Sequence, residues 1–136
     1  MWRYAALVRR KSFPFSQLGG KLLDSNEQAH EIADIISDKK GADITVLDIR
    51  PVSPIADYFV IATADSDRQA RAMIEEIEKR MKAQKHLPLS VDGEPGSGWV
   101  LMDYGDVLVH IFDPGTRDYY QLEELWNNAP TIVRIQ

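Results

Sequence analysis

Residues 98–112 have the sequence GWVLMDYGDVLVHIF, which predicts two β-strands joined by a tight turn at residues 103–106. Gly105 can adopt a positive φ at no steric cost, and the flanking carboxylates of Asp103 and Asp106 suit turn positions. Along the second strand, residues 107–112, alternate side chains point to opposite faces, and both faces are apolar. A strand of this kind is covered on both sides, so we expect it at the centre of an α/β sheet.

A second strand with two apolar faces is predicted at Tyr58–Thr63, and a half-buried strand at residues 44–49. Helices are predicted at residues 26–39 and 67–85. The pairs Ser25 with Gln28 and Ser66 with Gln69 have the spacing of capping boxes at the starts of these helices.

Residues 90–97 are rich in turn formers and predict a loop, and residues 131–135 are either an edge strand or loosely packed. A short helix is predicted after Pro114, with an apolar stripe of Tyr119, Leu122, Leu125 and Trp126. The order of the elements predicts a single α/β domain, in which helices cover both faces of a mixed sheet of four or five strands.

The composition excludes several classes of protein. The chain of 136 residues contains no cysteine, so disulfides, thiolate zinc sites and cysteine nucleophiles are excluded. No apolar run approaches the roughly 18 residues of a membrane span. A hydrophobic content of 44% is typical of a globular domain.

The charge is divided unevenly along the chain. Residues 1–23 carry a net charge of +5 without an acidic residue, and they predict a basic N-terminal extension ahead of a domain at 24–136. This extension is compatible with a transit peptide, a non-native start or a flexible segment. The domain carries 11 Lys and Arg against 21 Asp and Glu. Such a surface repels nucleic acid phosphates and attracts basic proteins, although it also simply favours solubility.

Two short motifs could indicate a metal site or RNA binding, but each is weak evidence. Asp65-x-Asp67 is a pattern that can hold a divalent cation, yet acids in the first turn of a helix are explained by the helix dipole. Arg9-Arg10-Lys11, near Phe13 and Phe15, is a short basic cluster of the kind that contacts RNA, too small to indicate sequence-specific binding. No phosphate-binding glycine motif and no metal-ligand spacing of histidines occurs. We therefore predict no enzyme activity, no catalytic residues, no metal and no cofactor.

Trp99 is the strongest candidate for binding a partner. It shares one strand face with Leu101 and Asp103, and Trp is enriched among the residues that dominate interface energetics. A core tryptophan at the start of a strand is equally consistent with the pattern.

Three segments resemble the ribosomal silencing factor (Iojap-like) family. DYFVIATADSDRQARAM at residues 57–73 is similar to its first half, and WVLMDYGDVLVHIFD with TRDYYQLEELW is similar to its second half. The resemblance spans roughly residues 25–126 and implies a nucleotidyltransferase-like α/β fold. It also implies a cytoplasmic translational repressor that binds the large ribosomal subunit through a basic interface protein, protein fourteen, and sterically blocks joining of the small subunit.

The same resemblance implies a docking face made of Trp99, Leu101, Asp103 and Tyr104, whereas Trp126 is assigned to packing. Two alternatives remain open. One is a nucleotidyltransferase-like phosphoryl-transfer enzyme that uses Asp65 and Asp67, and the other is a homodimeric adaptor in which Trp99 mediates self-association.

We expect removal of residues 1–23 to leave the melting temperature nearly unchanged, because the apolar groups in this segment follow no helical or strand period. Thermal unfolding of the shortened and full-length chains measures this difference. Unfolding or precipitation of the shortened chain would instead make the segment part of the core.

Overall fold

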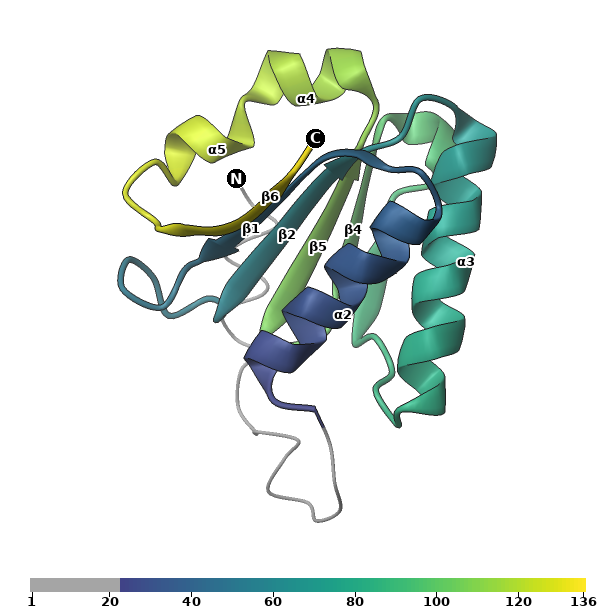
Figure 1. Ribbon diagram of the computed structural model, residues 1–136. Helices are drawn as coiled ribbons and strands as arrows, with labels where there is room; N and C mark the ends of the chain where they lie inside the picture. Colours follow the sequence, from purple (N-terminus) through teal and green to yellow (C-terminus); the bar gives the residue numbers. More distant parts are fainter. Residues whose placement is uncertain (1–22) are drawn as a thin grey trace.

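A computed structural model describes residues 23–136, which form one six-stranded mixed sheet with helices on both faces (Figure 1). The strands are β1 (Ala42–Asp48), β2 (Tyr58–Thr63), β3 (Ser90–Asp92), β4 (Trp99–Asp103), β5 (Val107–Phe112) and β6 (Thr131–Ile135). The helices are α2 (Ser25–Asp38), α3 (Asp67–Ala83), α4 (Pro114–Tyr120) and α5 (Leu122–Leu125), with a 3-10 turn at Pro95–Ser97. The spatial order of the strands is β3-β4-β5-β2-β1-β6.

The centre of the sheet is the parallel pair of β2 and β5, which runs from Tyr58 opposite Val107 to Thr63 opposite Phe112. Every residue of both strands is buried. The other strand pairs are antiparallel. The predicted central position of both strands is confirmed, as are the mixed sheet and the hairpin of β4 and β5.

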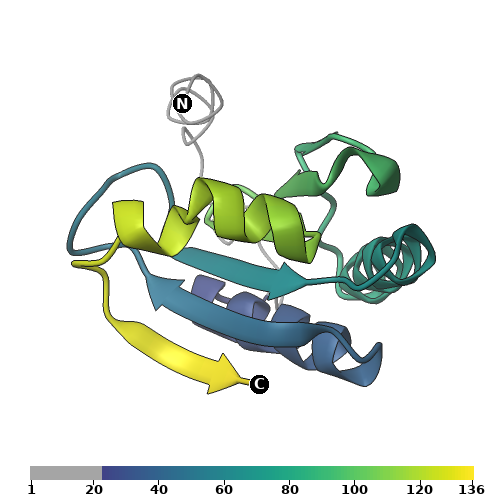
Figure 2. The same ribbon diagram turned by 90° about the horizontal axis from the view of Figure 1, so that it is seen from above.

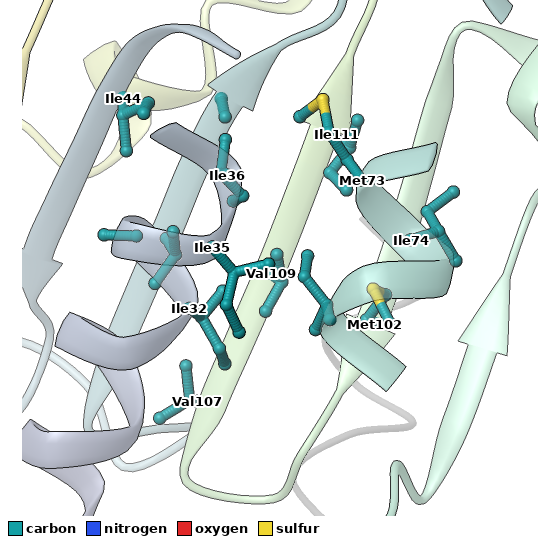
Figure 3. Close-up of a cluster of buried hydrophobic side chains, with 14 of the residues drawn as sticks. Ile32, Ile35, Ile36, Ile44, Met73, Ile74, Met102, Val107, Val109 and Ile111 are labelled. Carbon is teal, nitrogen blue, oxygen red and sulfur yellow. The ribbon is translucent and has the colours of Figure 1, made fainter. Parts of the chain in front are cut away.

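The sheet separates two hydrophobic clusters. Helices α2 and α3 cover one face, where Ile32, Ile36 and Met73 pack against Val109 and Ile111 of β5 (Figure 3). The segment of α4 and α5 crosses the opposite face (Figure 2). There, the fully buried Leu122 belongs to the same cluster as Phe59, Leu108 and Phe112. Alternate side chains of β5 therefore point into the two different clusters, as predicted, and the sheet is the middle layer of three.

The predicted number of four or five strands was too low. Strand β3 lies in a segment that its turn-forming residues assigned to a loop, and it pairs with β4 through Ser90, Val91 and Asp92. Three residues with a single apolar side chain give no periodic signal, so backbone pairing alone defines this edge strand. At the other edge, β6 pairs with β1, with Arg134 opposite Thr45.

Helix α2 begins one residue earlier than predicted, with Asp24 as its N-cap. The Asp24 carboxylate accepts from the Glu27 amide at 2.8 Å, and the Glu27 carboxylate accepts from the Asp24 amide at 3.0 Å. The predicted box of Ser25 and Gln28 is therefore wrong. Ser25 instead donates its hydroxyl to Asp57 at 2.8 Å, which ties the helix to the end of the β1–β2 loop.

The cap of α3 is confirmed in part. The Ser66 hydroxyl accepts from the backbone amide of Gln69 at 3.1 Å, as predicted. The side-chain oxygen of Gln69, however, accepts from the backbone amide of Asp65 at 2.6 Å. The Gln69 amide group also donates to the carbonyl oxygens of Lys39 and Lys40 at 3.2 and 2.8 Å, so it joins the start of α3 to the end of α2. The helix ends at Ala83, two residues before the predicted end.

The predicted basic extension lies outside the described residues except for Leu23. The Leu23 amide donates to Nε2 of His86 at 3.2 Å, and its carbonyl accepts from Gln28 at 3.1 Å. Burial lowers the pKa of His86, which favours the neutral ring that can accept this bond. The segment that can be removed without breaking a described contact therefore ends at residue 22. No helix within residues 23–136 is long and apolar enough to span a membrane.

We expect Asp24→Ala to destabilise the protein by about 1 kcal/mol, because it removes an N-cap acceptor. For a domain of this size the melting temperature should fall by roughly 3 °C, measured by thermal unfolding. Asp34→Ala, an exposed change in the same helix, is the control and should not lower the melting temperature. Equal losses in the two variants would contradict the assignment of Asp24 as the cap.

Candidate functional site

The hairpin of β4 and β5 is held by a tight turn after Asp103. Gly105 has a φ of +89°, as predicted from its place in the turn. Its amide donates to the Asp103 carboxylate at 2.7 Å, and the Tyr104 amide donates to the Val107 carbonyl at 2.9 Å. Asp103 is thus a structural acceptor within the turn.

The four predicted docking residues do not form one exposed surface. Leu101 and Asp103 are 0% and 1% exposed, and Tyr104, at 9%, belongs to the hydrophobic cluster on the opposite face of the sheet. Only Trp99 is half-buried and reaches the surface. The alternation of the strand placed Leu101 and Trp99 on one face correctly, but it did not show that Leu122 of α5 and Trp126 pack on that face.

Trp99 is fixed to the core through its indole ring. Its Nε1 donates to Nδ1 of the fully buried His110 at 3.2 Å, which requires the His110 ring proton to be on Nε2. The indole also packs on Phe112 with the ring centres 4.9 Å apart. One edge of Trp99 is therefore core and the other reaches the surface, and its predicted role in docking stays a prediction.

The exposed edge of Trp99 continues into two tyrosines of α4. Tyr120 is 47% exposed and lies 5.1 Å from Trp99 between ring centres, and Tyr119 is 80% exposed and 5.0 Å from Tyr120. These three residues, Trp99, Tyr119 and Tyr120, form an exposed aromatic surface. Solvent-exposed rings held against one another are a feature of protein-binding surfaces.

The sequence did not predict this surface, because it placed Tyr119 and Leu125 on a buried stripe of one helix. Gln121 adopts a left-handed conformation, with φ 45° and ψ 55°, and divides the helix into α4 and α5. Of the predicted stripe, Leu122 is buried, whereas Leu125 is 62% exposed. Trp126 packs edge-on against Phe59 at 5.2 Å, which agrees with its predicted packing role.

Asp65 and Asp67 lie at the carboxyl end of β2, where α/β folds commonly bind ligands. They line a hollow of about 180 Å³ together with Asp113, and the lining contains no Lys or Arg. Three carboxylates without a cation repel a phosphate group. Residues 23–136 contain no group of three or more His, Cys, Asp or Glu side chains positioned to hold a metal ion. The basic cluster at Arg9-Arg10-Lys11 lies outside the described residues.

The comparison with protein families gives a match over residues 23–136 to the family described as ribosomal silencing factor during starvation. The chain belongs to the ribosomal silencing factor family. A ribosomal silencing factor of Halalkalibacterium halodurans is 37% identical over 109 residues, which cover 79% of this chain and 93% of the relative. The Bacillus subtilis factor is 41% identical over 93 residues, which cover 68% and 79%.

Similar proteins include a mitochondrial protein and a protein of known crystal structure. A mouse protein named mitochondrial assembly of ribosomal large subunit protein 1 is 27% identical, over 91% of this chain and 54% of the relative. A crystal structure of a Chromobacterium violaceum protein has a TM-score of 0.74 at 32% identity and covers 77% of this chain and 88% of its own. The Halalkalibacterium halodurans and Bacillus subtilis relatives are both named ribosomal silencing factors.

We expect the protein with Asp65→Asn and Asp67→Asn to bind large ribosomal subunits as the wild type does. The double change should cost a few tenths to about 1 kcal/mol of stability, because Asp67 lies in the first turn of α3. Co-sedimentation with purified subunits and a magnesium-dependent nucleotide turnover assay test both points. Turnover by the wild type that disappears in the double variant would establish the phosphoryl-transfer alternative instead.

Proposed function

We propose that this protein represses translation by binding the large ribosomal subunit, where its volume excludes the small subunit. In this proposal the aromatic surface around Trp99 contacts a basic protein of the subunit interface, and the family resemblance implies that this protein is protein fourteen. Membership of the ribosomal silencing factor family supports a ribosomal role. The name of the mouse relative, which refers to assembly of the large subunit, supports the choice of subunit.

The observation that carries this proposal is the way Trp99 is held. Its indole is fixed by the bond to His110, so little conformational entropy is lost when a partner covers its exposed edge. Tyr119 and Tyr120 extend the contact area around it. A fixed Trp surrounded by rings is the arrangement that commonly dominates binding energy at protein interfaces.

In this proposal, the other three predicted docking residues do not touch the partner but hold the hairpin in shape. Leu101 packs beneath it in the same cluster as Trp99, and Asp103 closes the turn that sets the hairpin's geometry. Tyr104 anchors the turn in the opposite cluster. Replacing these three side chains should therefore act through the fold of the hairpin more than through direct contact.

The charge of the domain favours a basic partner. Residues 24–136 contain 11 Lys and Arg and 21 Asp and Glu, so the approach of a basic ribosomal protein is accelerated by electrostatic attraction. Steric exclusion requires only bound volume and sufficient affinity, so this function needs no cofactor. We place the protein in the cytoplasm, in line with its bacterial relatives.

We expect Trp99→Ala to weaken binding to large subunits by roughly thirtyfold, which corresponds to about 2 kcal/mol at an interface hot spot. Because half of the ring is core, the change should also lower stability, so binding is measured well below the melting temperature. Tyr120→Ala removes a ring that is 47% exposed and should weaken binding roughly tenfold with little loss of stability.

The matched control is Leu87→Ala, which removes a side chain that is 63% exposed and follows α3 rather than the hairpin. It should bind like the wild type in co-sedimentation. Sedimentation of each free protein reports whether the aromatic surface instead pairs two copies of the chain. A folded Trp99→Ala protein that co-sediments fully with large subunits would remove the aromatic surface from the mechanism.

A further inference from the structure

A polar pocket of about 400 Å³ lies between the β1–β6 edge of the sheet and the segment of α4 and α5. Figure 1 shows the chain continuing from α5 through a loop into the edge strand β6. The pocket has the volume of a small-ligand site. Its lining does not include Trp99, Tyr119 or Tyr120, so it is distinct from the aromatic surface.

The floor of the pocket contains a buried hydroxyl group. Thr45 of β1 is 2% exposed and lines the pocket, and within residues 23–136 its Oγ1 has no hydrogen-bond partner. A buried hydroxyl that makes no hydrogen bond destabilises a protein, so its presence requires an explanation. Leu47 and Trp126 add an apolar side chain and an aromatic ring to the lining.

The charges around the pocket favour a cation. Arg117 is neutralised by Glu123 at 2.7 Å and also donates to the Asp43 carbonyl at 2.6 Å and to Thr63 at 2.9 Å. Its guanidinium is therefore occupied by contacts within the protein and is not available to bind an anion. The remaining charged groups of the lining are two carboxylates, Asp118 and Glu124, and one exposed guanidinium, that of Arg134 on the edge strand.

We propose that this pocket binds the guanidinium group of an arginine side chain presented by another polypeptide. A guanidinium has five N–H donors in one plane, which match two carboxylates and a hydroxyl acceptor better than the compact ammonium of lysine does. An aromatic ring in the wall also favours a guanidinium over a hydrated ammonium. An anionic ligand would be repelled by Asp118 and Glu124, and in this lining only Arg134 would be available to bind it.

This inference does not rest on the proposed function, because it uses none of the residues of the aromatic surface. It is tested on the full-length protein without ribosomes. The probe is N-acetyl-arginine amide, and the matched control ligand is N-acetyl-citrulline amide, which has nearly the same shape without the charge. We expect the arginine compound to bind with a Kd of about 1 mM, as is usual for a ligand of this size.

Two-dimensional NMR titration should show saturable shifts for the amide of Thr45 and the indole N–H of Trp126 with the arginine compound, and much smaller shifts with citrulline. Asp118→Asn with Glu124→Gln should raise the Kd at least tenfold. The control pair, Asp34→Asn with Glu75→Gln, removes the same charge from exposed positions of α2 and α3 and should leave the Kd unchanged. Equal binding of both compounds, or equal losses in both variants, would overturn the proposal.

Thr45→Val provides a second and independent readout. It replaces the buried hydroxyl by a methyl group of similar size, so the free protein should melt at a higher temperature while the arginine compound binds less tightly. A variant that gains stability and binds the compound as well as the wild type would exclude Thr45 from the site. Shifts that report only generic charge effects across the whole acidic surface would exclude the pocket itself.

Discussion

The parallel pairing of β2 with β5 is the constraint on which the rest of this structure depends. Parallel neighbours cannot be joined by a hairpin, so the chain between them contains α3, β3 and β4 before it returns along β5. Because both strands are buried on both faces, helices must cover the sheet on two sides. Helices α2 and α3 supply one cover, and α4 with α5 supplies the other.

Sequence reasoning was accurate where burial is complete and failed where backbone geometry decides. The bounds of β2 and the faces of β5 followed directly from apolar side chains on every position or every second position. Strand β3 contains only Val91 as an apolar side chain, so no pattern could reveal it. At the start of α2, Asp24 and Ser25 are both good caps, and the choice depends on Ser25 bonding to Asp57, a residue 32 positions away.

The candidate site shows the same division. Alternation along β4 placed Trp99 on the correct face, yet the coverage of that face depends on Gln121, whose left-handed conformation no helical period predicts. The sequence pattern predicted one helix with Tyr119 and Leu125 on its buried side. Both side chains are exposed instead, so the aromatic surface lies where the sequence pattern predicted burial. The pocket beside Thr45 is lined by Gln121 itself, by α5 and by Trp126, so the break in the helix forms part of its wall.

The aromatic surface and the polar pocket are both attached to α4, and this helix is unusually well fixed for its length. It begins at the Asp113 cap directly after β5, and Arg117 ties it to β1, β2 and Glu123 of α5. Trp99 is fixed from below by His110 of the central strand. The geometry of both surfaces is therefore fixed by contacts with the buried centre of the sheet, so little conformational entropy is lost on binding. A rigid platform of this kind suits the proposed exclusion of the small subunit, because exclusion requires a bound domain that keeps its shape.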